Sequence, residues 1–438
     1  MMTKRGFSID VFVEQSDPYS EKTWIDRIGR FHRISPITLG FEYDDTYRNT
    51  ESNYPISLSM TKSALSYQDE PNAPVVSNFL WGLLPDDANM LKAYAKALDA
   101  SHADPLALLA AIGPDCPGAL MFGQPDTEPA MTLIPHDELS ELIRELRTYA
   151  ARSVFGAEPG YFSLAGAQSK TALVYDKQKD QWFRPTGSHP STHIFKPAMT
   201  EHADQALNED FCLKLAKRAG LAAATSFVLQ SGEECALVSE RYDRMLIPGV
   251  QNGPSEHILR IHQEDMCQAL GKHPDQKYER DGGPTVGDVL RLLADHSSEP
   301  EDIERFFKAV VFNYLICGSD AHAKNYSVLH GFDKECLLAP LYDMNSLYPY
   351  TNQRKSQKVA MSIGGKYVLY DIRPSHFKAE AAAVGVDSKT SGDWLEEIVI
   401  GLSEQARACR GDCDVESATL DQIVKGIEVQ SKLTLSRM

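Results

Sequence analysis

The stretch GSDAHAKNYS, residues 318–327, gathers side chains that could move a phosphoryl group. It follows the apolar run FFKAVVFNYLIC and places Asp320 and Asn325 five positions apart. The loop H-R-D-x-x-x-x-N of protein kinases has this spacing; its Asp accepts the proton of the acceptor hydroxyl and its Asn holds a metal ion. Because an ordinary surface loop could also carry one such pair, the chemistry requires further parts elsewhere in the chain.

A second acid and a lysine occur in the order that phosphoryl transfer requires. Asp343 ends the apolar run LAPLYD, downstream of Asn325. Lys196 ends the strand-like segment THIFK, and Glu209 on the next predicted helix is a candidate partner. An inward lysine on a strand is costly unless a carboxylate or a phosphate accompanies it. A turn aspartate and an exposed edge lysine are the ordinary alternatives, but the ordered series from Lys196 through Asp320 to Asp343 favours a kinase-type site.

The stretch FSLAGAQSK is a candidate phosphate loop. Its small residues are Ala165, Gly166 and Ala167, flanked by Ser163 and Gln168. Backbone N–H groups of small residues can approach phosphate oxygens closely. The stretch matches neither G-x-G-x-x-G nor a P-loop, so an ordinary tight turn is the alternative.

Two more polar side chains lie within the loop that holds Asp320. Lys324 could neutralise the transferring phosphoryl group, and a solvated loop lysine is the alternative. His322 is expected to make structural hydrogen bonds, because Asp320 already supplies a base.

Hydrophobic periodicity predicts an α+β fold with two lobes, like that of a protein kinase. The predicted domains are an N-terminal subdomain at 1–150, a sheet-containing lobe with the candidate phosphate loop and strand lysine at 151–245, and a mainly helical lobe at 246–438. Alternating segments, among them residues 54–60 (YPISLSM), predict short strands in the first domain. The segment NFLWGLLPDDANMLKAYAKAL predicts helix interrupted at Pro85.

Composition limits the classes of partner. With 44 Lys plus Arg against 61 Asp plus Glu, the net charge of −17 argues against nucleic-acid binding by the bulk field of the protein. The N-terminal stretch MMTKRGFSIDVFVEQSD has no apolar core of signal-peptide length, and no segment approaches the length of an uncharged membrane span. Cysteines in apolar patterns, such as Cys212, Cys267 and Cys317, favour reduced core thiols and a cytoplasmic location.

The sequence resembles the HipA-type serine/threonine kinase toxins of bacterial type II toxin–antitoxin systems. The resemblance covers nearly the whole chain. Its most specific stretches are SLAGAQSKTAL, HIFKP, NEDFCLKLAKRAGL, SERYDR, HQEDMCQALG, KYERDGGP, GSDAHAKNYSV and LAPLYDM. The expected fold is therefore HipA-like, with an extra N-terminal subdomain before the two kinase lobes.

The resemblance implies a role for each matching residue. Asp320 would be the catalytic base, Asn325 and Asp343 would hold Mg²⁺, and Lys196 would contact the ATP phosphates. The motif residues near the active site that receive no firm role are Gln263, Glu264 and Asp265.

The hinge and the phosphate loop also receive roles from this resemblance. Glu240 and Tyr242 would present backbone groups to adenine. Ser163 matches the serine whose autophosphorylation ejects the loop and inactivates such kinases. Ser319, not Arg, precedes Asp320, so no receiver for an activation-loop phosphate is evident and control through the phosphate loop is the expectation.

The resemblance implies an ATP- and Mg²⁺-dependent protein kinase that acts as the toxin of a toxin–antitoxin pair. Its partner would be a HipB-like helix-turn-helix antitoxin, which would make any DNA contact, and an aminoacyl-tRNA synthetase is the suggested protein substrate. Two alternatives stay open: a small-molecule kinase of related fold, and a catalytically silent corepressor scaffold.

Overall fold

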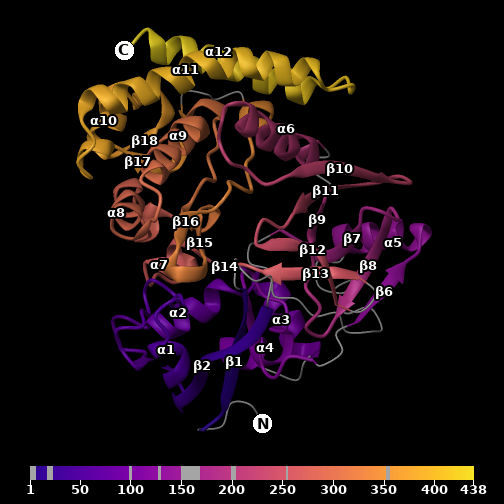
Figure 1. Ribbon diagram of the computed structural model, residues 1–438. Helices are drawn as coiled ribbons and strands as arrows, with labels where there is room; N and C mark the ends of the chain where they lie inside the picture. The colour runs from indigo at the N-terminus through magenta and orange to yellow at the C-terminus, as the bar shows by residue number, and fades with distance from the viewer. Residues whose placement is uncertain are drawn as a thin grey trace. The chain divides into compact units, whose positions relative to one another are not determined.

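A computed structural model describes most of the chain as two compact units. The described residues are 6–16, 23–97, 101–126, 130–148, 168–198, 204–252, 255–351 and 356–438. Unit 1 comprises residues 1–197, 229–275 and 329–335; unit 2 comprises residues 198–228, 276–328 and 336–438. Figure 1 traces the elements of both. The predicted domain boundaries at 150 and 245 stay predictions. Within the described ranges, no helix combines the length and apolar character needed to cross a membrane.

The first sheet of unit 1 is antiparallel, with the order β4-β3-β2-β1-β5. Its strands are β1 (Ser8–Ser16), β2 (Thr23–Ser35), β3 (Thr38–Tyr43), β4 (Ser66–Gln68) and β5 (Leu120–Phe122). Phe31 and Phe41 face each other across β2 and β3, and both are fully buried. Gly29 allows the close approach of these strands, since a Cβ there would lie 2.3 Å from the Glu42 carbonyl oxygen.

Short helices cover this sheet and complete its core. They are α1 (Asp45–Asn49), α2 (Val75–Gly82), α3 (Ala88–Ala97) and α4 (Pro105–Ile112). Phe79 of α2 stacks on Phe31 with a ring-centroid distance of 6.3 Å. The predicted interruption of helix at Pro85 is confirmed. The predicted strand at 54–60 is wrong, because this segment forms only an isolated bridge between Ser57 and Met60.

The second sheet of unit 1 carries the predicted strand lysine. Its order is β11-β9-β7-β8-β6, and β10, whose first residues belong to unit 2, pairs with β11. The bounds are β6 (Ala130–Ile134), β7 (Thr171–Asp176), β8 (Gln181–Thr186), β9 (His193–Pro197), β10 (Ser226–Ser231) and β11 (Glu234–Glu240). Trp182 of β8 packs edge-on against Phe195 of β9 at 4.7 Å between ring centroids, so the two strands that flank β7 are linked by a side-chain contact.

Five further elements complete the description of unit 1. They are α5 (His136–Thr148), the hairpin of β12 (Arg244–Asn252) and β13 (Ser255–Arg260), and β14 (His262–Asp265) followed by α7 (Met266–Ala269). Arg144 and Arg147 of α5 form ion pairs with Glu234 at the start of β11.

Unit 2 is mainly helical, as predicted. Its elements are α6 (Gln205–Arg218), α8 (Val286–His296), α9 (Glu301–Ile316), β15 (Ser327–His330, whose end belongs to unit 1), β16 (Cys336–Leu338), β17 (Lys358–Ile363), β18 (Lys366–Val368), α10 (Pro374–Ala382), α11 (Ser388–Gly411) and α12 (Ala418–Leu435). The long helices α11 and α12 lie side by side (Figure 1). Helix α9 is buried along most of its length, so its C-terminal end is a rigid starting point for the loop that follows.

Candidate active site

The loop that holds Asp320 starts where α9 stops. Cys317 adopts a left-handed conformation with φ of 56°, which ends the helix. The N–H of Gly318 then donates to the Asn313 carbonyl at 2.7 Å. The Ser346 hydroxyl donates to the carbonyl of Ile316 at 2.6 Å, which caps the last turn. The chain therefore leaves the core in one defined direction.

Backbone hydrogen bonds fix the loop itself. The N–H of His322 donates to the Asp320 carbonyl at 2.8 Å, and the N–H of Asn325 donates to the His322 carbonyl at 2.9 Å. The side-chain amide of Asn325 also donates to the Asp320 carbonyl at 2.9 Å. The backbone of Asp320 is thus held from two sides while its side chain is exposed. The structure brings this predicted pair together as one closed turn.

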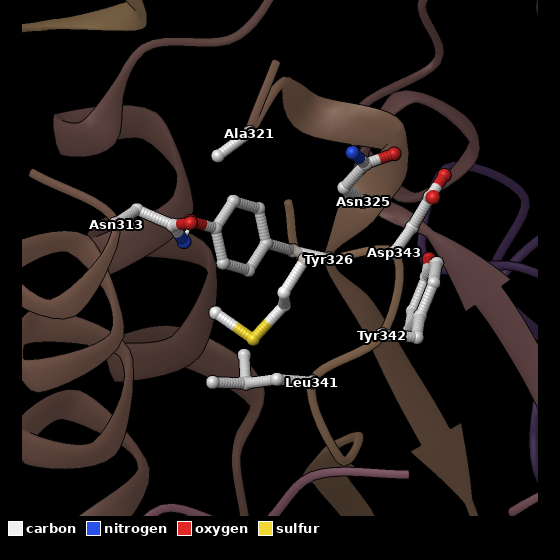
Figure 2. A pocket seen from close by; sticks show the side chains of 8 residues that line it. Asn313, Ala321, Asn325, Tyr326, Leu341, Tyr342 and Asp343 are labelled. Atoms are coloured by element: carbon white, nitrogen blue, oxygen red, sulfur yellow. Dashed lines mark hydrogen bonds between the residues drawn. The ribbon is translucent and has the colours of Figure 1, made fainter. Parts of the chain in front are cut away.

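Asn325 and Asp343 line one small pocket of unit 2. Its lining residues are Asn313, Ala321, Asn325, Tyr326, Leu341, Tyr342, Asp343 and Met344. Figure 2 shows the side-chain ends of Asn325 and Asp343 next to each other and pointing the same way. Tyr326 forms part of the wall, accepting a hydrogen bond from the Asn313 amide at 2.9 Å, and burial raises the pKa of its hydroxyl well above the usual range.

The backbone of Asp343 is unusual and places its carboxylate at this pocket. Its φ of 55° lies in the left-handed region, which an aspartate adopts more readily than most residues. The neighbouring Tyr342 is anchored, because its hydroxyl donates to the Lys324 carbonyl at 2.7 Å. This bond ties the Asp343 segment to the loop that carries Asp320 and Asn325.

The donor set at this pocket fits a hard cation. A carboxylate and an amide oxygen are ligand types that Mg²⁺ accepts, and Mg²⁺ in kinase sites completes its shell with water and phosphate oxygens. The amide nitrogen of Asn325 donates to the Asp320 carbonyl, so the oxygen of this amide faces away from that bond. Asn325 and Asp343 could therefore hold the ion together with nucleotide phosphates.

Lys324 and His322 are both buried, with 6% and 5% of their surfaces exposed. The alternative of a solvated loop lysine at 324 is therefore wrong. The His322 ring meets the ring of Tyr278 edge-on at 5.0 Å between centroids, which agrees with the structural role expected for it. The role of Lys324 in stabilising the transferring phosphoryl group stays a prediction.

In unit 1, Lys196 lies on an inner strand. It pairs with Leu237 of β11, and the neighbouring Phe195 pairs with Thr171 of β7. Only 8% of Lys196 is exposed, so the alternative of an exposed edge lysine is wrong. Gln168 lies beside the end of this strand, where its amide donates to the Pro197 carbonyl at 3.2 Å. Pairing of Lys196 with Glu209 stays a prediction.

Four residues of the candidate phosphate loop lie outside the described residues. They are Ser163, Ala165, Gly166 and Ala167. Their assigned roles stay predictions.

The predicted hinge residues flank a buried ionic cluster. Glu240 pairs with Lys177, and the Tyr242 hydroxyl donates to the Gln263 side chain. Between them, Arg241 points inward and meets Asp243 at 2.8 Å. The structure thus fixes the backbone on both sides of the proposed adenine contact.

This ionic cluster consists of Asp115, Arg241, Asp243, Arg244 and Arg260, whose side chains are at most 4% exposed. Arg244 meets Asp115 at 2.7 Å, and the N–H of Gly118 donates to Asp243 at 2.7 Å. Burial by itself would raise the pKa of Asp115, but the charges of Arg244, Arg241 and Arg260 outweigh it and hold this pKa well below its usual range. Sequence reasoning missed the cluster, although the charge density of SERYDR was a signal.

The motif residue Glu264 also has a structural partner set. It is 1% exposed and accepts hydrogen bonds from the Ser57 hydroxyl, from the Leu58 N–H at 2.8 Å and from His330 at 2.9 Å. Asp265 caps α7 with a capping box. These contacts connect the segment 54–60 to β14.

Comparisons with known proteins agree with this arrangement. Residues 162–406 match the family described as HipA-like C-terminal domain, and residues 22–123 match the HipA N-terminal domain. The chain is 32% identical over 424 residues to Y4mE of Sinorhizobium fredii, a candidate kinase by name, covering 94% of this chain and 97% of the relative. It is 30% identical over 338 residues to the serine/threonine-protein kinase toxin HipA of Shewanella oneidensis, covering 72% of each chain.

A solved structure shows the same fold. Shewanella oneidensis HipA, solved in complex with HipB and its operator DNA, matches with a TM-score of 0.76 at 22% identity over 98% of this chain and 97% of that chain. The predicted α+β, two-lobed fold class is therefore confirmed.

Proposed function

This chain belongs to the HipA family of kinase toxins, and from that premise we propose that it is an ATP- and Mg²⁺-dependent serine/threonine protein kinase, the toxin of a toxin–antitoxin pair. The observation that carries the proposal is the arrangement in unit 2. The exposed Asp320 lies on a loop whose backbone is fixed by hydrogen bonds. Asn325 of the same loop lines a pocket together with Asp343.

In the proposed reaction, Asp320 accepts the proton of a serine or threonine hydroxyl. The hydroxyl oxygen forms a bond to the γ-phosphorus of ATP, the bond from that phosphorus to the bridging oxygen breaks, and ADP leaves. Asn325 and Asp343 would hold Mg²⁺, which neutralises charge on the phosphates. Buried Lys196 is proposed to contact the phosphates, and Lys324 to stabilise the transferring group.

The nucleotide base and the control of activity are assigned by resemblance. Backbone groups of Glu240 and Tyr242 are proposed to bind adenine, next to a buried ionic cluster that keeps this segment rigid. Ala165, Gly166, Ala167 and Gln168 are proposed to wrap the phosphates, and autophosphorylation of Ser163 to inactivate the enzyme. A phosphoserine adds about −1.5 to −2 charge, which would repel the ATP phosphates.

We further infer a HipB-like helix-turn-helix antitoxin as partner. The HipA structure from Shewanella oneidensis contains HipB and operator DNA. The net charge of −17 fits a basic partner and leaves DNA contact to that partner. A cytoplasmic aminoacyl-tRNA synthetase is the proposed class of target.

Phosphopeptide mapping of cells that express the parent chain or Asp320→Asn tests this function. The expected result is phosphoserine or phosphothreonine on a cellular protein, dependent on Asp320. Transfer from labelled ATP to metabolites alone would favour the small-molecule kinase. Absence of ATP binding and of any ATP turnover in the purified chain would favour the silent corepressor scaffold.

A further inference from the structure

The segment KYERDGGP, residues 277–284, is folded tightly beside the loop of Asp320. The N–H of Gly283 donates to the Tyr278 carbonyl at 3.1 Å. Gly282 is left-handed with φ of 89°, and a Cβ on Gly283 would lie 1.8 Å from the Gln276 carbonyl oxygen. Glycine is therefore required at both positions, and the turn gives Tyr278 a defined backbone.

Tyr278 contacts the proposed catalytic base directly. Its hydroxyl donates to one carboxylate oxygen of Asp320, Oδ1, at 2.6 Å. This length is typical of a hydroxyl bound to an ionised carboxylate. The Tyr278 ring also packs edge-on against His322, and the N–H of Ala323 donates to the Lys277 carbonyl at 3.2 Å. The segment thus contacts the loop through one backbone bond, one ring contact and one bond to the base.

The residue after Tyr278 anchors the segment on its other side. Glu279 accepts hydrogen bonds from the hydroxyl of Ser362 at 2.8 Å and from the N–H of the same residue, in β17. The Arg280 guanidinium lies over the Tyr278 ring, 4.9 Å from its centroid. Because these contacts restrain the backbone and the ring, the Tyr278 hydroxyl is a fixed reference point for an otherwise exposed carboxylate.

We propose that Tyr278 is a positioning residue for phosphoryl transfer: its hydroxyl holds Oδ1 of Asp320 so that Oδ2 is presented to the acceptor hydroxyl. The proposal rests on the proposed function, in which Asp320 is the base. An exposed aspartate side chain can occupy several rotamers, and only some of them point an oxygen at the acceptor. Holding one oxygen selects among these rotamers before the acceptor arrives, which is a gain in orientation.

The test is Tyr278→Phe, which removes the hydroxyl and keeps the ring against His322. The matched control is Tyr370→Phe, at an exposed tyrosine of unit 2 outside the proposed site. Loss of a hydrogen bond to a charged group predicts a roughly 10- to 100-fold lower kcat. The KM and the Kd for ATP should stay within about twofold of the parent values. The unfolding midpoint should be indistinguishable from that of the parent.

A double-mutant cycle distinguishes positioning from a structural contribution. If Tyr278 acts through Asp320, Tyr278→Phe has no further effect on the residual transfer rate of Asp320→Asn. An equal fold-loss in both backgrounds, or a Tyr278→Phe variant with the parent kcat, overturns the proposal. If Asp320→Asn itself transfers phosphate at the parent rate, the proposed role of Asp320 as the base fails first, and the inference fails with it. That result differs from one in which phosphoryl transfer depends on Asp320 but not on Tyr278, which overturns the inference alone.

Discussion

The charge-rich stretches SERYDR, at 239–244, and GSDAHAKN, at 318–325, use their carboxylates in opposite ways. Asp243 of the first is 2% exposed and bound to Arg241 and the N–H of Gly118. Asp320 of the second is exposed, and the contacts that fix its position are made largely by backbone atoms. A buried and paired carboxylate stabilises the fold, whereas an exposed carboxylate on a fixed backbone can exchange a proton with a substrate.

This contrast also shows what each region loses when it is altered. Removing one partner from a buried ionic cluster leaves uncompensated charges inside the protein. Removing an exposed carboxylate leaves nothing unsatisfied in the core. Substitution of a buried, paired aspartate should therefore lower stability, whereas substitution of the exposed Asp320 should lower activity and leave stability unchanged.

The largest expected effect is the loss of activity in Asp320→Asn. The variant keeps the size of the side chain but cannot accept the hydroxyl proton, so kcat should fall on the order of 10²- to 10⁴-fold. The free energy of unfolding should change by less than about 0.5 kcal/mol, because the side chain is exposed. Steady-state transfer from labelled ATP and urea unfolding are the two measurements. Near-parental turnover would remove Asp320 from the role of base.

The next effect concerns stability and the buried cluster. Asp115→Ala leaves Arg241, Arg244 and Arg260 without a shared acid and should cost about 3–5 kcal/mol of unfolding free energy. Denaturant titration with the linear extrapolation measures it.

Asp10→Ala is the matched control for this change. Asp10 also pairs with two arginines, Arg27 and Arg30, but its side chain is 31% exposed and theirs are 41% and 48% exposed. Solvent screening limits the expected cost to less than about 1 kcal/mol. Equal losses in the two variants would contradict the distinction between buried and exposed pairs.

Local sequence patterns were sufficient to predict much of this molecule. The helix α9, the loop at Asp320 and the strand of Lys196 all follow from periodicity and spacing within short windows. The segment 54–60 was wrongly predicted as a strand, because Ser57 bonds to Glu264, 207 positions away. Tyr278 is likewise 42 positions from Asp320. No local sequence pattern specifies contacts between residues that are so far apart in the chain. Contacts of this kind determine which charged residues are buried.

A third prediction uses pH to probe His193 and His262, two of the buried histidines of unit 1. Burial lowers the pKa of His193 to about 4 and that of His262 to about 3. The unfolded chain binds a proton at each of these groups below about pH 6.5, while the folded chain stays neutral there. The stability that these two neutral histidines contribute is therefore fully present above the pKa of histidine in the unfolded chain. It is lost as the pH falls toward their lower pKa values in the folded chain.

Lowering the pH from 7 to 5 should reduce the unfolding free energy by about 2 kcal/mol for each of these histidines. His193→Gln removes one titrating group, so the pH dependence of its unfolding free energy should be shallower by that amount. Chemical unfolding at several pH values measures both slopes. A His193→Gln variant with the parent slope would show that this histidine titrates alike in the folded and unfolded states.

The smallest expected effect is the most specific, and it concerns the proposed metal ligand Asp343. Its φ of 55° makes Asp343→Asn the appropriate variant, because asparagine tolerates the left-handed region and only the charge is removed. Asp333→Asn is the matched control, since Asp333 is exposed and has a φ of 59°. Because hard cations prefer carboxylate oxygen, Asp343→Asn should weaken nucleotide affinity roughly tenfold in the presence of Mg²⁺. In the presence of a chelator its affinity should match the parent within about twofold, and Asp333→Asn should match the parent under both conditions. Calorimetric titration with ATP gives all six values, and an equal loss with and without Mg²⁺ would make Asp343 a structural residue whose backbone conformation, not its charge, shapes the pocket.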